Sequence, residues 1–131
     1  MNRSFRFFAR DARGAAALEF ALAAPALILM MWGLFQIGLI FLANAGTQSA
    51  LGEAARYATI YPTPSDSALQ TTITSHKFGL KNGTWSTPTI ATDAANGTKT
   101  ISVVYSQPTN FLFFKGPTVS ISKSKVVYVS S

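Results

Sequence analysis

Few side chains in this sequence could do catalytic chemistry or bind a metal ion. The 131 residues contain no cysteine and a single histidine, His76. A thiol nucleophile, a disulfide framework, a cysteine metal site and a multi-histidine metal cage are therefore excluded. The sequence also has no Ser/His/Asp set and no glycine-rich phosphate loop. We accordingly expect no enzymatic activity, no cofactor and no metal site, and we place His76 at the surface or half-buried.

The residue in the most unusual setting is Glu19, which directly precedes an apolar run from Phe20 to Leu42. A carboxylate at the edge of a membrane segment costs free energy unless it has a partner, so such a residue is by default a functional candidate. The alternative is that Glu19 lies at headgroup level, where it is solvated and inert.

The apolar run after Glu19 is long enough to cross a membrane. It has 23 residues and no charge, and as a helix it would measure about 35 Å against a hydrocarbon core of about 30 Å. A core helix of a soluble protein is one alternative, but it would rarely be this long. A cleaved secretory signal is another, with Ala43-Asn44-Ala45 as its cleavage pattern, but signal cores span roughly 7–15 residues. The run therefore predicts a single membrane span.

Charged residues on the two sides of the run predict its orientation. Arg3, Arg6, Arg10 and Arg13 precede it, and only Arg56 follows within about 20 residues. Because basic residues favour the cytoplasmic side, we expect a cytoplasmic N-terminus and a span in the inner membrane. The C-terminal part is then periplasmic or extracellular.

The positive charge of the chain does not indicate nucleic-acid binding. Residues 1–14 hold four arginines and Asp11, which is half of the net charge of +6. The remaining charge is spread without a run or a helical stripe, whereas nucleic-acid surfaces cluster Lys and Arg. We expect no nucleic-acid partner.

The residues around Glu19 form the sharpest motif in the sequence. After a short basic leader, the chain places one glycine, four small or apolar residues, a glutamate and an aromatic residue, in the run Gly14-Ala15-Ala16-Ala17-Leu18-Glu19-Phe20. This run resembles the processing site of type IV prepilins of the tight-adherence branch, which read G-x-x-x-x-E-[F/Y]. Together with residues 19–25 and 54–58, it resembles the TadE-like pseudopilin domain over roughly residues 13–58. Many members of that family carry a glutamate late in the span, where this chain has Gln36.

The resemblance implies how the N-terminus is used. A prepilin peptidase, which is a membrane aspartyl peptidase, would cut between Gly14 and Ala15 at the cytoplasmic face, where glycine leaves the extended backbone accessible. The new ammonium of Ala15 would pair with Glu19 of a neighbouring subunit, and a buried pair of this kind fixes register. Phe20 completes the motif. The implied partners are the membrane, the prepilin peptidase and other pilin-like subunits in a homo- or hetero-oligomeric helical assembly.

Two residues inside the run have more than one interpretation. Pro25 removes a backbone hydrogen bond and favours a helix kink, which either lets helices pack in a bundle or is a tolerated irregularity. Gln36 could hydrogen-bond a neighbouring helix, or it could point to its own backbone or to water in the lipid.

The helix is expected to continue beyond the membrane to about residue 60. Glu53 and Arg56 are expected as a surface pair, and Pro62 and Pro64 end the helix. Apolar residues recur at spacings of three and four and define one stripe, made of Ala50, Leu51, Ala54, Ala55, Ala58 and Tyr61.

The remaining sequence predicts a small domain with a short helix and a sheet. Ser65-Asp66-Ser67 can cap a short helix that runs to about Leu80, and alternating apolar residues predict an antiparallel sheet of about three strands. These strands are Thr84–Thr92, Lys99–Gln107 and Thr118–Ser130. The predicted fold class is thus α+β, with a basic prepilin-like leader at 1–14, a membrane-spanning and extended helix at 15–60, and an extracytoplasmic domain at 61–131.

An aromatic cluster, Phe111-Leu112-Phe113-Phe114, falls between Pro108 and Pro117 and is predicted to form a loop. It could be a partner surface or an anchor at the membrane edge. We expect it instead to close the bottom of a small core.

Two functions remain open from the sequence. The first is a structural pilin-like subunit, a pseudopilin or minor pilin, of a tight-adherence type IV pilus or secretion filament. The second is a single-pass envelope protein that never polymerises and whose outer domain binds a partner or ligand. Removal of the leader after Gly14 favours the first, and an intact N-terminus favours the second.

Overall fold

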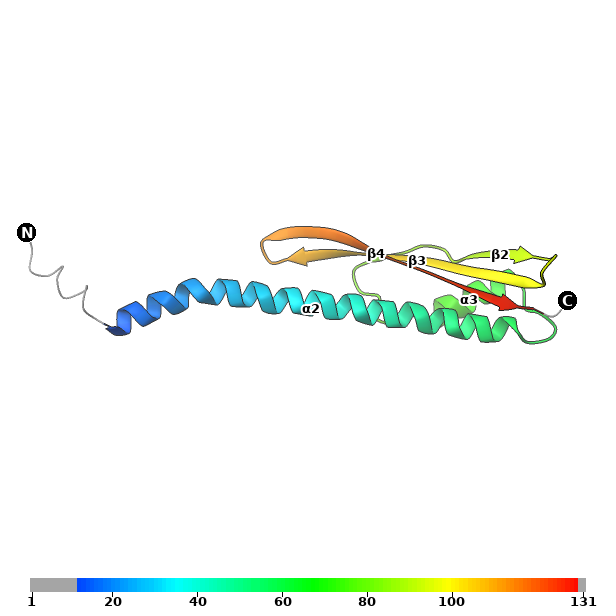
Figure 1. Ribbon diagram of the computed structural model, residues 1–131, viewed down its shortest axis with the longest axis horizontal. Helices are drawn as coiled ribbons and strands as arrows, with labels where there is room; N and C mark the ends of the chain where they lie inside the picture. Colours follow the sequence, from blue (N-terminus) through cyan, green and yellow to red (C-terminus); the bar gives the residue numbers. More distant parts are fainter. Residues whose placement is uncertain (1–11, 130–131) are drawn as a thin grey trace, which may run out of the picture.

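The computed structural model describes residues 12–129, with side chains from Gly14 onward. Figure 1 shows one long helix, with a second helix and a sheet lying along its far half. The predicted α+β class is confirmed, whereas the predicted leader lies outside the described residues except for residues 12–14. In chain order the elements are α2 (Ala12–Ala58), α3 (Asp66–His76), β1 (Thr84–Trp85), β2 (Thr89–Asp93), β3 (Thr98–Phe111) and β4 (Phe114–Tyr128).

Helix α2 is rich in alanine and leucine, which favour helix strongly, and it ends at Ala58. Its last turn closes through Thr59 N–H to the carbonyl oxygen of Arg56 at 3.3 Å. The prediction that Tyr61 belongs to the buried stripe is wrong. Its side chain is 76% exposed because the helix has ended three residues earlier.

Helix α3 starts where the sequence predicts but stops sooner. The hydroxyl oxygen of Ser65 accepts a hydrogen bond from Ala68 N–H at 3.3 Å and so caps the first turn. The predicted end at Leu80 is wrong, since Lys77 already has extended backbone angles. Gly79 then turns the chain at φ 70°, a value that glycine adopts without steric cost.

Strand β3 is the centre of the antiparallel sheet. Strand β4 pairs along one edge of β3, and β1 and β2 pair in succession along its other edge. The single strand predicted at residues 84–92 is therefore two strands. Pro88 separates them because it has no N–H to give to a ladder, and Ser86 N–H still donates to Val104 O at 2.9 Å.

The loop predicted between Pro108 and Pro117 is instead the end of a long hairpin. Strands β3 and β4 run through both prolines and turn at Leu112 and Phe113. The ladder pairs Pro108 with Thr118 and Asn110 with Lys115, so Gly116 and Pro117 together face one residue, as in a β-bulge. A bulge on an edge strand is one of the few sheet positions that accept proline.

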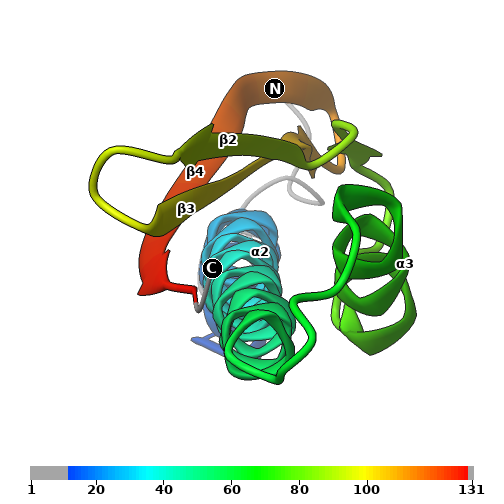
Figure 2. The ribbon, with the colours of Figure 1, turned by 90° about the vertical axis from the view of Figure 1, so that its right-hand side faces the viewer.

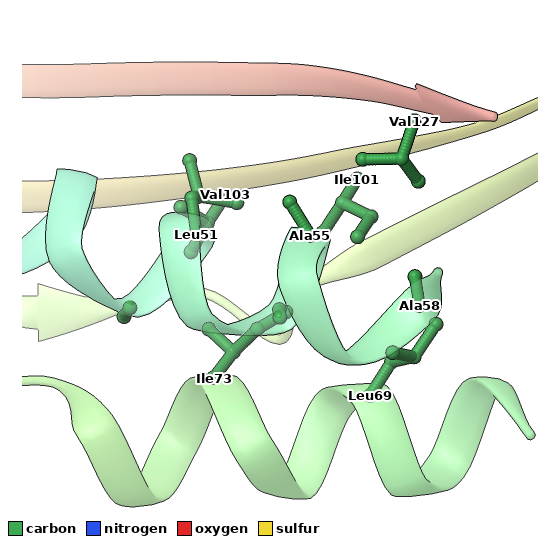
Figure 3. Close-up of a cluster of buried hydrophobic side chains, with 10 residues drawn as sticks. Leu51, Ala55, Ala58, Leu69, Ile73, Ile101, Val103 and Val127 are labelled. Atoms are coloured by element: carbon green, nitrogen blue, oxygen red, sulfur yellow. The ribbon is translucent and has the colours of Figure 1, made fainter. Parts of the chain in front are cut away.

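The core lies between one face of the sheet and the two helices, which Figure 2 shows side by side beneath the sheet. The predicted alternation in β3 is confirmed, because Ile101, Val103 and Tyr105 are buried. Figure 3 shows side chains of α3 and of the sheet converging on α2 from two sides. The main buried cluster consists of Ala50, Leu51, Ala54, Ala55, Ala58, Leu69, Ile73, Ile101, Val103 and Val127.

Candidate functional site

The first part of α2 projects beyond the rest of the described chain. From residue 14 to residue 31 no side chain is buried, and Leu18, Phe20 and Leu22 are 64–73% exposed. We call this segment the stem. Among the described residues, α2 is the one helix long and apolar enough to cross a membrane, with a mean hydropathy of 2.2 in its most apolar window. This single N-terminal apolar helix indicates a single-pass membrane protein.

The motif residues occupy the start of the stem. Gly14 is the third residue of α2, and a side chain there would meet nothing within 4 Å. Ala15 and Glu19 lie one helical turn apart, so they share one face of the helix. Glu19 and Phe20 are both exposed. Within residues 14–129, Glu19 forms no ion pair.

Pro25 lies in the middle of the stem, and α2 remains helical on both sides of it. The proline side chain is exposed. Figure 1 shows α2 curving in its blue first part, and a proline inside a helix favours such a bend.

Beyond the stem, α2 meets the hairpin through polar contacts that the sequence did not suggest. The side-chain nitrogens of Trp32 and Gln36 both donate to the carbonyl oxygen of Asn110, at 2.6 and 2.7 Å. Within the chain Nε2 of Gln36 bonds the hairpin, a partner that neither interpretation from the sequence named. The acceptor is a main-chain atom that any residue would supply, so no sequence pattern could identify it.

At the end of the molecule opposite the stem, polar side chains mainly hydrogen-bond neighbouring groups in helix ends and turns. His76 is exposed as predicted and its Nδ1 lies 2.9 Å from Thr72 O. The carboxylate of Asp93 accepts hydrogen bonds from Asn96 and Ala95 in the β2–β3 turn, and these bonds hold the pKa of Asp93 below its ordinary value. Between α3 and β1 lies a groove of about 550 Å³, lined by Ser67, Gln70, Thr71, Thr74, Ser75, Trp85, Thr87 and Pro88.

The comparisons with known proteins give a family match for the region that contains the stem. Residues 14–56, about a third of the chain, match the family model described as TadE-like protein. A search of curated proteins and a search of solved structures gave no significant match. The matched region begins at Gly14, includes Glu19 and Pro25, and ends on the part of α2 that packs against the sheet. Residues 14–56 of the chain are therefore similar to a TadE-like protein.

Proposed function

We propose that the protein is a pilin-like subunit, a pseudopilin or minor pilin, of a tight-adherence type IV pilus or secretion filament. The observation that supports this most is that the TadE-like region begins with an apolar stem that no other described part of the chain covers. An uncovered apolar helix is stable in a lipid bilayer or against similar helices. A filament subunit lies first in the membrane and then in a bundle of similar helices, so its helix must be stable in both.

In this proposal residues 1–14 are the leader, residues 15–60 are the membrane-spanning and extended helix, and residues 61–131 are the outer domain. The four arginines of the leader favour the cytoplasmic side of the inner membrane. A reporter that is active only in the cytoplasm, fused after Ser131, should therefore be silent. Activity of this fusion would contradict the orientation.

Prepilin peptidase is proposed to cut between Gly14 and Ala15. Both residues are helical, and because a peptidase binds an extended backbone, the first turn of α2 must unwind. Unwinding costs little at a helix end, and glycine at position 14 lowers the cost further by about 1 kcal/mol relative to alanine. Gly14→Ala should therefore slow processing in cells that contain the peptidase, as read from the intact mass. Gly38→Ala is the matched control, because this glycine also has nothing within 4 Å.

After the cut, the ammonium of Ala15 and the carboxylate of Glu19 can pair in two ways. Helical side chains lean toward the N-terminus, so Glu19 can reach the ammonium of its own chain, one turn away. In a bundle it can also reach the ammonium of a neighbour, which would fix the axial register of the two subunits. The proposal requires the second pairing, since only that one joins subunits.

Removal of the Glu19 carboxylate tests the proposal. Glu19→Ala should leave membrane insertion intact or improve it, because the carboxylate itself disfavours insertion. Assembly should fail, since the loss of one partner of a buried pair costs about 3–5 kcal/mol. Glu19→Gln keeps the shape and one acceptor and should assemble in part. The measurement is co-purification with filament components at matched membrane levels.

Glu53→Ala is the matched control on the same helix. Glu53 forms the predicted surface pair with Arg56 at 3.1 Å, and such a pair contributes little, so this variant should assemble normally. Equal recovery of Glu19→Ala and wild type would contradict the filament proposal. It would favour the second function, a single-pass envelope protein that does not polymerise.

A further inference from the structure

The end of the β3–β4 hairpin lies beside the middle of the apolar run of α2. Asn110 O accepts hydrogen bonds from Trp32 and Gln36. A methyl group added at Gly33 would lie 3.7 Å from Cε1 of Phe111, so the Phe111 ring packs beside the same helical turn. Figure 1 shows the hairpin turn lying over the light-blue part of α2. The outer domain therefore covers α2 from about residue 32, ten residues before the apolar run ends.

This end of the hairpin has polar contacts on its inner side and apolar side chains on its outer side, the reverse of a hairpin exposed to water. The contacts with α2 include two hydrogen bonds to Asn110 O, whereas the side chains on the outside are large and apolar. Leu112 is 49% exposed, Phe113 77% and Phe114 58%. On α2, Trp32 and the neighbouring Phe35 are exposed as well, with ring centroids 5.6 Å apart. The expectation that the aromatic cluster closes a core is therefore wrong, because three of its four residues point to the surroundings.

Backbone hydrogen bonding limits how deep this hairpin can lie in a bilayer. On the edge of β3 that faces β1 and β2, pairing stops at Ser106 among the described residues, so residues 107–111 form a sheet edge without a strand partner, on which Asn110 O is bonded to α2. Open edges do not occur in the hydrocarbon region, because lipid offers no hydrogen bonds. The boundary of the hydrocarbon must therefore lie at or before the hairpin turn.

The length of the stem agrees with that boundary. From Gly14 to Trp32, where α2 first contacts the hairpin, the helix rises about 27 Å, against a hydrocarbon core of about 30 Å. The helix can thus cross most of the bilayer before it meets the hairpin. Aromatic side chains are enriched at the boundary between lipid and water, which is where this geometry places both aromatic groups.

We propose that the hairpin turn and the adjoining turn of α2 form a lipid-binding anchor at the outer surface of the membrane. Its residues are Trp32, Phe35, Leu112, Phe113 and Phe114, and its ligand is the headgroup and upper acyl region of phospholipids. The exposed Lys115 follows directly, with a long apolar stem and an ammonium suited to lipid phosphates. The anchor fixes the depth at which α2 leaves the bilayer. It rests on the membrane span of the proposed function, but it does not require assembly.

Site-directed spin labelling tests the anchor, and the absence of cysteine makes each label unique. The full chain carries Phe113→Cys and is reconstituted at low protein density in vesicles of phosphatidylethanolamine and phosphatidylglycerol. Tyr128→Cys is the matched control, because Tyr128 is 78% exposed and lies at the opposite end of β4. Leu27→Cys reports the span itself. Each label is exposed to oxygen, which partitions into lipid, and to a water-soluble nickel chelate.

The anchor predicts that the ratio of oxygen to nickel accessibility at position 113 is several-fold higher than at position 128 and lower than at position 27. Equal ratios at positions 113 and 128, with a lipid-like ratio at position 27, would overturn the anchor and leave the span intact. A label at position 113 that is shielded from both agents would overturn it too, since protein would then cover the turn. A water-like ratio at position 27 would overturn the span and the anchor together.

Discussion

Gln36 of α2 donates a hydrogen bond from Nε2 to the main-chain oxygen of Asn110 at 2.7 Å, across 74 residues of sequence. The glutamine side chain is only 8% exposed, although it belongs to an otherwise apolar stretch. A buried amide without a partner would cost a few kcal/mol. The bond therefore accounts for the polar residue in the apolar run and, with the bond from Trp32, ties the hairpin end to α2.

Replacement of Gln36 by leucine should loosen the hairpin end. Gln36→Leu keeps the side-chain size and removes the donor, with an expected cost of about 1 kcal/mol because Trp32 still donates to the same oxygen. Trp32→Phe in the same chain should raise the cost further. The measurement is amide hydrogen exchange, which should quicken at residues 108–118 and stay unchanged at residues 98–104. Unchanged exchange at both places would show that these bonds do not hold the hairpin.

Two glycines of α2 should respond oppositely to alanine. At Gly46 a Cβ atom would overlap the main-chain oxygen of Phe78, so the chain after α3 must move. Gly46→Ala should lower the free energy of unfolding by about 1–3 kcal/mol. At Gly38, where nothing lies within 4 Å, alanine should be neutral or stabilise the helix by up to about 1 kcal/mol. Thermal unfolding of the full chain in detergent compares them, and a Gly46→Ala midpoint equal to that of Gly38→Ala would contradict the close approach.

Truncation of Leu69 should show how strongly α3 depends on α2. Leu69 is fully buried against the alanine face of α2 (Figure 3), so Leu69→Ala should cost about 2–5 kcal/mol of unfolding free energy. Ile60→Ala is the comparison, since Ile60 is 51% exposed, and it should change stability far less. Near-ultraviolet circular dichroism during heating measures both, and equal effects would mean that α3 does not share this core.

Tyr105 should make the fold sensitive to alkali. Burial raises the pKa of Tyr105 above its ordinary value of 10.0, and its hydroxyl donates to Lys81 O at 3.0 Å. Above pH 10 the unfolded chain releases a proton that the folded chain retains, so stability falls as the pH rises toward the folded pKa. Below pH 10 Tyr105 is protonated in both the folded and the unfolded chain, so it has no effect on the pH dependence of stability. Tyr105→Phe should flatten the alkaline branch of a stability–pH profile, and an unchanged branch would assign it to other groups.

Local patterns predicted the parts of the fold that depend on local physics. The alternation of Ile101, Val103 and Tyr105 identified the inner face of β3 because strand side chains repeat every two residues. Ser65 predicted the start of α3, since its hydroxyl satisfies an N–H that the helix leaves unpaired. Gly14 and Glu19 were recognised as one motif through the resemblance to the tight-adherence prepilin pattern, and the roles proposed for them are predictions.

Long-range relationships were not predictable in the same way. Proline normally ends a strand, but here β3 and β4 run through Pro108 and Pro117. Pro117 lies in the bulge of the edge strand β4, and Pro108 lies where β3 has no strand partner on its other edge among the described residues. The hairpin docks on α2 through a main-chain carbonyl oxygen. Every residue has such an oxygen, so the sequence could not indicate this contact. The apolar run also gave no sign that about its second half is covered on one side, since residues that face protein and residues that face lipid are both apolar.

The molecule is thinner around the first half of α2 than around the second half, and this difference in thickness restricts the shape of any assembly. The stem is a single helix about 10–12 Å across, whereas the second half of α2 carries α3 and the sheet (Figure 2). Such a molecule is a tapered wedge. Wedges whose thin ends touch cannot lie flat in a layer, because their thick ends would collide, so they fan out around a common axis. Close contact between stems would then bend any array into a rod, with curvature built into each subunit.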